Sequence, residues 1–220
     1  EKLFTTNVRK PIFNAQIKPK SPSEGVIYND DFIELAQKYE SAGVDAISIL
    51  TDEPSFGGSL ELLHDISQNV NLQILRKDFI LSKSQLTESL KNHADAVLLI
   101  VSFLNKQKLS ELIKFSYELG IVPIVEVISE KELDIAVETG AKIIGVNARN
   151  LHTLNIDYEN ALKVLRKIPT SITPLLFSGI KTKQDVQRAI KSGAKGILVG
   201  TSLLKAKNIQ YKIRELRNDF

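Results

Sequence analysis

Short apolar runs alternate with amphipathic stretches along this 220-residue chain, and this alternation limits its fold more than any other feature. Apolar, β-rich runs occupy residues 11–17, 45–50, 72–76, 95–101, 121–127, 142–147, 172–177 and 195–200. Helical patterns lie between them, for example over 31–42, 106–119, 130–138, 157–167 and 181–192. Eight strands that each precede a helix indicate a (β/α)8 barrel, because an open doubly wound sheet would seldom need eight such units in so few residues. The sequence therefore predicts an α/β fold, a TIM barrel that forms one single domain over residues 1–220.

The joints from helix to strand favour the same fold. The phrases SAGVDAI (41–47), ETGAKII (138–144) and KSGAKGI (191–197) each place a glycine where a helix ends and an apolar strand follows. Glycine is favoured there because the residue after a helix often takes a left-handed conformation. The chain has no linker and no low-complexity stretch that would separate a second domain.

The composition excludes several classes of function. The 29 basic and 26 acidic residues leave a net charge of +3, and the lysines are scattered, which gives no support for a nucleic-acid or membrane partner. There is no apolar run near 18 residues and no signal-peptide pattern, so we expect a cytoplasmic protein. We also expect a monomer that acts on a small-molecule substrate. The chain has no cysteine, and His64, His93 and His152 share no ligand spacing, so we expect no metal site.

Polar residues gather where the predicted strands end, which is where a TIM barrel carries its chemistry. They are Gln16, Lys18, Ser48, Lys77, Asp78, Glu126, Asn147, Arg149, Ser178, Gly179, Gly200 and Thr201. This set is too polar to belong to the core, so we expect it to surround one pocket.

Two turns in this set have the composition of a phosphate site. SGI (178–180) and VGTSLL (199–204) follow the seventh and eighth strands, and each places glycine and a hydroxyl residue ahead of a helix. Backbone N–H groups there can hold a dianion, and Lys18 could reach the same anion. In a single turn of this kind, the simplest role of glycine is to allow a tight turn. Two such turns on adjacent strands favour a phosphate-binding site instead.

Lys77 and Glu126 form the second notable combination. They end the third and fifth strands and should project into one cavity. An ammonium group and a carboxylate in one pocket can act as general acid and base, but a structural ion pair is an equally good interpretation of the sequence.

The motifs along the chain resemble, in order, those of indole-3-glycerol phosphate synthase, a tryptophan biosynthesis enzyme that closes and decarboxylates a carboxyphenylamino-deoxyribulose phosphate. They are IKPKSPSEG (17–25), AISILTDEPSFGGSLELL (46–63), LRKDFIL (75–81), AVLLIV (96–101), VEV (125–127), GVNARNL (145–151), SGI (178–180) and VGTSLL (199–204). The resemblance covers nearly the whole chain and implies a lyase without a cofactor. It also implies that the family's N-terminal extension is absent here.

The resemblance assigns roles to individual residues. It implies Lys77 as the general acid, Glu126 as the proton-handling carboxylate and Asn147 as a positioning group. Lys18 would contact the carboxylate or phosphate end of the substrate, and Arg149 would also bind the substrate. The phosphate cradle would comprise Ser178, Gly179, Gly200 and Thr201. The walls around the substrate's aromatic ring would comprise Leu50, Phe56, Phe79 and Leu99.

Two positions depart from the family pattern. Gln16 stands where the first strand normally carries a carboxylate, and Phe177 stands where the seventh strand normally ends in glutamate. Asn14 is also unusual, because alternation places it inward and one layer below Gln16, where an apolar residue is common. A buried amide needs a partner, and Gln16 is the nearest candidate.

These departures lead to three hypotheses. Phe177 could be a stacking surface for a planar heterocycle, and Glu126 could be the base. These two roles favour an engineered Kemp-type eliminase on a remodelled barrel. The lack of methionine and tryptophan favours this too, since it indicates either an edited sequence or a segment of a longer reading frame. The alternatives are a natural, divergent indole-3-glycerol phosphate synthase and a non-catalytic sugar-phosphate binder.

Overall fold

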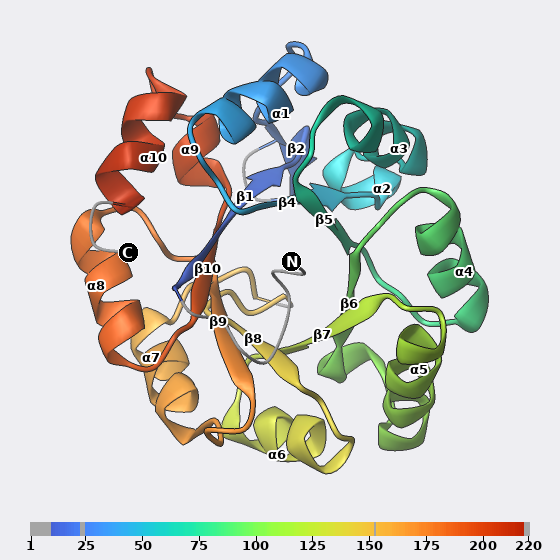
Figure 1. The fold of residues 1–220 in the computed structure, drawn as a ribbon. Helices are drawn as coiled ribbons and strands as arrows, with labels where there is room; N and C mark the ends of the chain where they lie inside the picture. Colours follow the sequence, from blue (N-terminus) through green and yellow to red (C-terminus); the bar gives the residue numbers. More distant parts are fainter. Residues whose placement is uncertain (1–9, 23–24, 152, 218–220) are drawn as a thin grey trace.

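The computed structural model describes residues 10–22, 25–151 and 153–217. Eight parallel strands close into a barrel in the order β1-β10-β9-β8-β7-β6-β5-β4 (Figure 1). The strands are β1 (Ile12–Ile17), β4 (Ala46–Leu50), β5 (Gln73–Lys77), β6 (Ala96–Ile100), β7 (Val122–Val127), β8 (Ile143–Asn147), β9 (Thr173–Phe177) and β10 (Gly196–Val199). Each lies within one residue of its predicted range at either end, so the predicted TIM barrel is confirmed.

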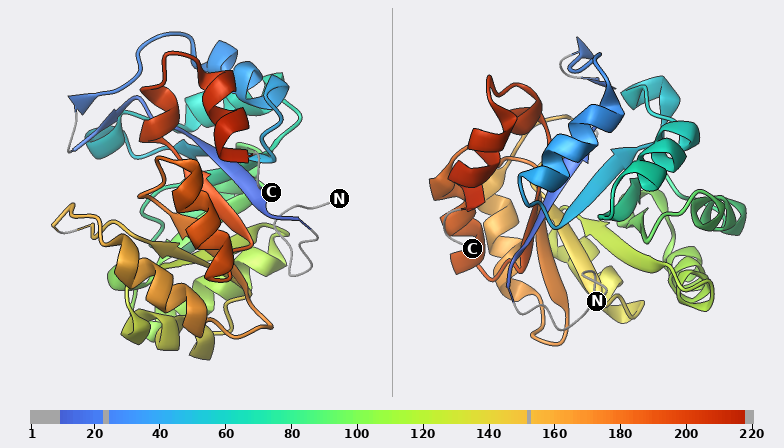
Figure 2. Two further views of the ribbon diagram at one scale, coloured as in Figure 1. Left: turned by 90° about the vertical axis from the view of Figure 1, so that its left-hand side faces the viewer. Right: turned by 45° about the horizontal axis from the view of Figure 1, so that its top comes forward.

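A ring of helices surrounds the strands, and the side views show the same two layers (Figures 1 and 2). The long helices are α1 (Phe32–Ser41), α3 (Leu60–Asn69), α4 (Lys83–Lys91), α5 (Lys106–Glu118), α6 (Glu130–Glu138), α7 (Tyr158–Lys167), α8 (Lys183–Lys191) and α10 (Ile209–Arg217). The short elements are α2 (Glu53–Phe56), α9 (Thr201–Leu204), the 3-10 turn η1 (Val101–Phe103) and the small hairpin β2 (Lys20–Ser21) and β3 (Gly25–Val26).

Polar side chains fix where these helices begin. A side-chain oxygen of the residue before the helix accepts a hydrogen bond from a first-turn backbone N–H at Asp31, Ser59, Ser82, Asn105, Ser129, Asp157 and Thr182. Such caps satisfy N–H groups that have no partner inside the helix. They set the length of the loops that connect each strand to its helix.

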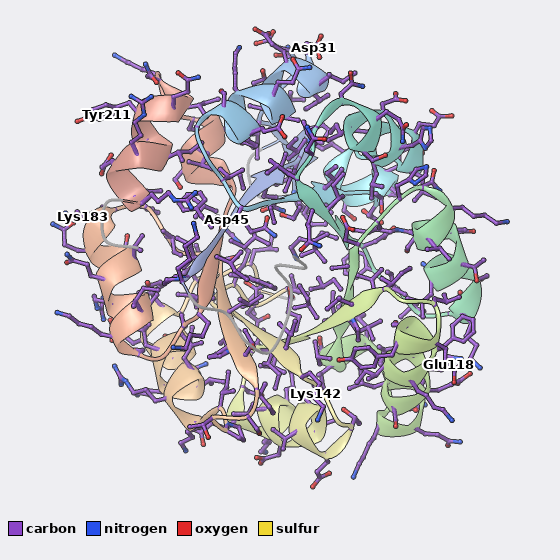
Figure 3. All side chains as sticks on the ribbon, viewed as in Figure 1. Asp31, Asp45, Glu118, Lys142, Lys183 and Tyr211 are labelled. Atoms are coloured by element: carbon purple, nitrogen blue, oxygen red, sulfur yellow. The ribbon has the colours of Figure 1, made fainter. Side chains whose placement is uncertain are left out.

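Successive side chains along each strand pack alternately in two separate apolar layers. The inner layer fills the barrel and includes Leu75, Leu98, Ile124, Leu175 and Leu198. The outer layer lies between strands and helices, and the charged residues Asp31, Glu118 and Lys183 lie beyond it on the outside of the ring (Figure 3).

Leu99 belongs to the outer layer, so the prediction that it walls the pocket is wrong. Its neighbours Leu98 and Ile100 point into the barrel instead. Successive side chains on a strand point to opposite faces, so an error of one residue moves a side chain from one layer to the other.

Candidate active site

Two adjoining cavities open at the carboxyl ends of the strands. The first, here called the inner cavity, has a volume of about 80 Å³ and mixes apolar walls with Lys77 and Asn147. The second, here called the basic cavity, has a volume of about 540 Å³. Gln16, Lys18 and Arg149 line both, so they mark the junction.

Most of the predicted site residues meet at these cavities. Those that line the inner cavity are Gln16, Lys18, Leu50, Phe56, Lys77, Phe79, Asn147, Arg149 and Ser178. Those that line the basic cavity are Gln16, Lys18, Arg149, Ser178, Gly179, Gly200 and Thr201. Glu126, Phe177 and Leu99 line neither.

Lys77, Glu126 and Asn147 form a hydrogen-bonded chain at the floor of the inner cavity. The Lys77 Nζ lies 3.2 Å from Glu126 Oε2, and Asn147 Nδ2 donates to Glu126 Oε1 at 2.9 Å. Glu126 has 0% of its surface exposed, whereas Lys77 and Asn147 line the cavity. The carboxylate therefore faces the cavity through its two partners, and Lys77 is the member of the chain that can give a proton to a bound molecule.

Phe177 is not a stacking surface. It is only 2% exposed and packs in the inner apolar layer, with Lys77 Nζ 5.8 Å from its ring centroid. The ring fits there because Gly145 lies opposite, where an added Cβ would come within 2.3 Å of the ring. A planar ligand in the inner cavity would not reach the face of this ring, so the predicted role of Phe177 is wrong.

The Phe177 and Gly145 contact makes a stability prediction. Gly145→Ala should lower the free energy of unfolding by about 1–3 kcal/mol, because the new methyl group overlaps a buried ring. The double variant Gly145→Ala/Phe177→Leu should recover part of that loss, since leucine is smaller. Urea denaturation of the three proteins measures this, and a single variant as stable as the parent would contradict the contact.

Asn14 points inward as predicted, but without the predicted partner. It is 4% exposed, and its Oδ1 accepts no hydrogen bond within the described part of the chain. The same holds for Ser48 Oγ on the neighbouring strand β4. Gln16 is therefore not a donor to Asn14 Oδ1, and the prediction of that bond is wrong.

The two glycine turns lie together at the basic cavity. Ser178 and Gly179 both take left-handed conformations, with φ of 64° and 80°. A Cβ at Gly179 would come within 2.7 Å of the Tyr158 ring, and one at Gly200 within 2.5 Å of Gln16 Oε1. Gly179 therefore needs glycine, both for its left-handed φ and for the close Tyr158 ring, whereas the Gln16 side chain could move away from a Cβ at position 200. Ser202 Oγ ties the two turns together by donating to Ile180 O at 2.9 Å.

Several lysines that the sequence analysis did not select also line the basic cavity. Lys181, Lys205 and Lys212 join Lys18 and Arg149 there. They lie in loops or on the last helix, and no local pattern marks them. Their positive charges favour an anionic ligand at this end of the site.

The loop after β8 supplies wall residues that sequence reasoning missed. Leu151 and Leu154 line the inner cavity, and Leu154 has a φ of 61°. Arg149 Nη1 donates to Leu154 O at 2.8 Å, and Arg149 pairs with Ile156 in a short β-bridge. The sequence signal for these wall residues was that Leu151 and Leu154 are apolar residues in an otherwise polar loop.

No group of three or more histidine, aspartate or glutamate residues suited to a metal occurs among the described residues. The rings of His64 and His93 approach to 5.4 Å between centroids, and His152 lies outside the described residues. None of the described helices is long and apolar enough to cross a membrane.

Comparison with known proteins identifies the family. The family model of indole-3-glycerol phosphate synthase matches residues 1–216. Proteins of that name from Aquifex aeolicus and Sulfurisphaera tokodaii are 42% and 40% identical, each over 98% of this chain and over 84% and 86% of their own lengths. One from Halalkalibacterium halodurans is 42% identical over 92% of this chain and 79% of its own length.

A solved structure, thiamine phosphate pyrophosphorylase from Pyrococcus furiosus, covers 97% of this chain with a TM-score of 0.67. The alignment covers 96% of that structure. Its sequence identity is 16%, so this likeness shows the fold alone.

These relatives overturn the preferred hypothesis. An identity of about 40% to natural synthases over most of the chain gives no sign of engineering, so the Kemp-type eliminase is wrong. The buried ring of Phe177 removes its structural basis as well. The chain is an enzyme of the lyase class and belongs to the indole-3-glycerol phosphate synthase family.

Proposed function

We propose that this enzyme converts the carboxyphenylamino-deoxyribulose phosphate into indole-3-glycerol phosphate, with loss of carbon dioxide and water, in tryptophan biosynthesis. The observation that carries the proposal is the position of Lys77, which lines the inner cavity while its ammonium contacts the buried Glu126 carboxylate. The family membership of the chain supports the same reaction.

The two cavities match the two ends of such a substrate. The phosphate fits the basic cavity, where Lys18 and Arg149 lie beside the glycine turns. The aromatic ring fits the inner cavity, between Leu50, Phe56 and Phe79. The inner cavity is the smaller of the two, at about 80 Å³ against about 540 Å³, and has the apolar walls that suit a flat ring.

Lys77 is the proposed acid. When the ring carbon that bears the carboxylate attacks the ketone, the Lys77 ammonium gives a proton to the carbonyl oxygen that becomes a hydroxyl group. Loss of carbon dioxide restores the aromatic ring. Protonation of the hydroxyl group then lets it leave as water, while the neighbouring methylene carbon loses a proton to solvent and the double bond of the indole forms. Glu126 keeps the ammonium in place and also fixes the Asn147 amide, which lines the inner cavity and orients the substrate.

The missing carboxylates make this a slow enzyme. Gln16 lines both cavities without a charge, and Phe177 fills buried space with a ring. A positioned acid or base contributes about a hundredfold or more to a rate. We therefore expect turnover well below that of a synthase with all three carboxylates.

Lys18 gives the test of substrate orientation. Lys18→Ala should raise KM for the sugar phosphate about tenfold or more, because the variant loses a cation at the junction of the cavities. Lys20→Ala is the matched control, since this neighbouring lysine lies in β2 and packs against Gly57 instead. The measurement is steady-state formation of the indole product.

Two results would count against the proposal. Equal KM values for Lys18→Ala and the parent would remove Lys18 from the substrate site. Saturable binding of the sugar phosphate by the parent with no product would replace the proposed reaction with simple binding.

A further inference from the structure

A buried polar cluster surrounds Arg76 at the carboxyl end of β5, behind the wall of the inner cavity to which Asp78 contributes. Arg76 is 3% exposed and points outward between strands and helices. Its Nη2 lies 2.8 Å from Asp78 Oδ2, and its Nη1 donates to Gln85 O at 2.8 Å and to Ser89 Oγ at 3.0 Å. The guanidinium group therefore connects the end of β5 to helix α4.

Thr51 connects the same pair to the next loop. Its Oγ1 donates to Asp78 Oδ2 at 2.6 Å and accepts from Arg76 Nε at 3.0 Å. The Thr51 backbone N–H donates to Lys77 O at 3.2 Å. The other oxygen, Asp78 Oδ1, accepts from the Phe79 backbone N–H at 2.7 Å. We call Thr51, Arg76 and Asp78 the β5 clamp.

The clamp encloses Lys77 in the sequence. Arg76 precedes it and Asp78 follows it, and their side chains pair at 2.8 Å, so the residues on both sides of Lys77 are fixed, while the Thr51 N–H holds the Lys77 carbonyl. Lys77 itself points inward, because side chains alternate along a strand. The clamp fixes the start of a long flexible side chain whose Nζ must reach Glu126 and the substrate.

Stability alone is a poor explanation for this cluster. Replacing a buried ion pair with apolar groups of similar size is often neutral or favourable, because two charges must lose their water. A buried Arg76 and a nearly buried Asp78 can instead hold the neighbouring residues in one defined arrangement. The nearest groups that need a fixed geometry are Lys77 and the ring of Phe79, which both line the inner cavity.

We propose that Arg76 and Asp78 are positioning residues for the reaction, which act through Lys77 and Phe79. This inference rests on the proposed function. The Asp78 oxygens are already engaged by Arg76, Thr51 and the Phe79 N–H, so the carboxylate holds the loop in place and does not transfer the proton.

The test is Asp78→Asn with a matched control at the other end of the barrel. Asp45 also accepts a backbone N–H, that of Phe13 at 2.8 Å, and an arginine, Arg217 at 2.9 Å. It precedes β4, away from both cavities, and lies among the strands in Figure 3. Asp78→Asn should lower kcat about tenfold with KM within about twofold, because a small misplacement of an acid is costly. Asp45→Asn should leave both constants unchanged.

Crystal structures of the two variants give a readout that does not depend on activity. In Asp78→Asn the distance from Lys77 Nζ to Glu126 Oε2 should exceed the 3.2 Å of the parent, while Asp45→Asn should keep it. Thr51→Val, which removes only the shared hydroxyl, serves if Asp78→Asn does not fold, and should shift kcat in the same direction.

The outcomes separate this inference from the proposed function. A parent enzyme without turnover rejects the proposed function, and the crystal structures then decide whether the clamp positions Lys77. An unchanged Lys77 position in Asp78→Asn, or a kcat equal to that of Asp45→Asn, overturns the clamp proposal while the proposed function stands.

Discussion

Lys77→Met should lower kcat for indole-3-glycerol phosphate formation by about a thousandfold or more. A positioned proton donor accounts for about 10²–10⁴ of a rate, and Lys77 is the ammonium group that lines the inner cavity beside Glu126. Methionine keeps most of the apolar length of the side chain and removes the proton. The measurement is steady-state turnover at saturating substrate.

The same variant should also lose stability, and this effect must be separated from catalysis. Removing Lys77 leaves the fully buried Glu126 with Asn147 as its described partner, and breaking a buried ion pair costs about 3–5 kcal/mol. The double variant Lys77→Met/Glu126→Gln removes both charges and should regain much of that stability. It should stay inactive.

Lys83→Met provides the control, since Lys83 is an exposed lysine paired with Glu111 on the outer ring. It should keep the parent kcat. If Lys77→Met turned over at more than about a tenth of the parent rate, Lys77 would not be the acid, and the ion pair with Glu126 would be structural.

The sequence predicted the barrel well because each strand is a short apolar run, and glycine joints precede β4, β8 and β10. It was weaker on the direction of single side chains. The run AVLLIV (96–101) is apolar on both faces, so nothing in it tells Leu98 from Leu99. The structure places Leu98 in the inner layer and Leu99 in the outer one.

Phe177 shows a different limit of sequence reasoning. Its inward direction was predictable, but its depth depends on Gly145, which lies on the neighbouring strand and is distant in sequence. Without that contact, the ring at a strand end suggested a binding surface. Burial of Glu126 behind Lys77 and Asn147 was hidden for the same reason, since it depends on three strands.

The position of the phosphate turns could be predicted from local composition. Glycine and hydroxyl residues were visible in the sequence, and both turns line the basic cavity. The β5 clamp was not predicted, although an arginine inside an apolar strand is a signal in its own right. Its partners Thr51 and Ser89 lie on other elements, so only the fold brings them to Arg76.

Gln16→Glu should raise kcat about a hundredfold. Gln16 lies at the junction of the two cavities, between groups assigned to the phosphate and to the ring. Glutamate has nearly the same size and shape as glutamine, so the change adds a carboxylate without new volume. A carboxylate there could accept the proton that the substrate loses as water departs, and one positioned base is worth about a hundredfold or more.

Gln210→Glu is the charge-matched control, because Gln210 is exposed on α10 and contacts Ser41. It should leave kcat unchanged. A rise in kcat confined to Gln16→Glu, with KM nearly constant, would mean that the chain keeps the acid half of the reaction and lacks a base. A kcat that stays flat or falls would instead mean that the added charge weakens Lys77 or repels the substrate carboxylate. The reaction here would then proceed without a base on β1.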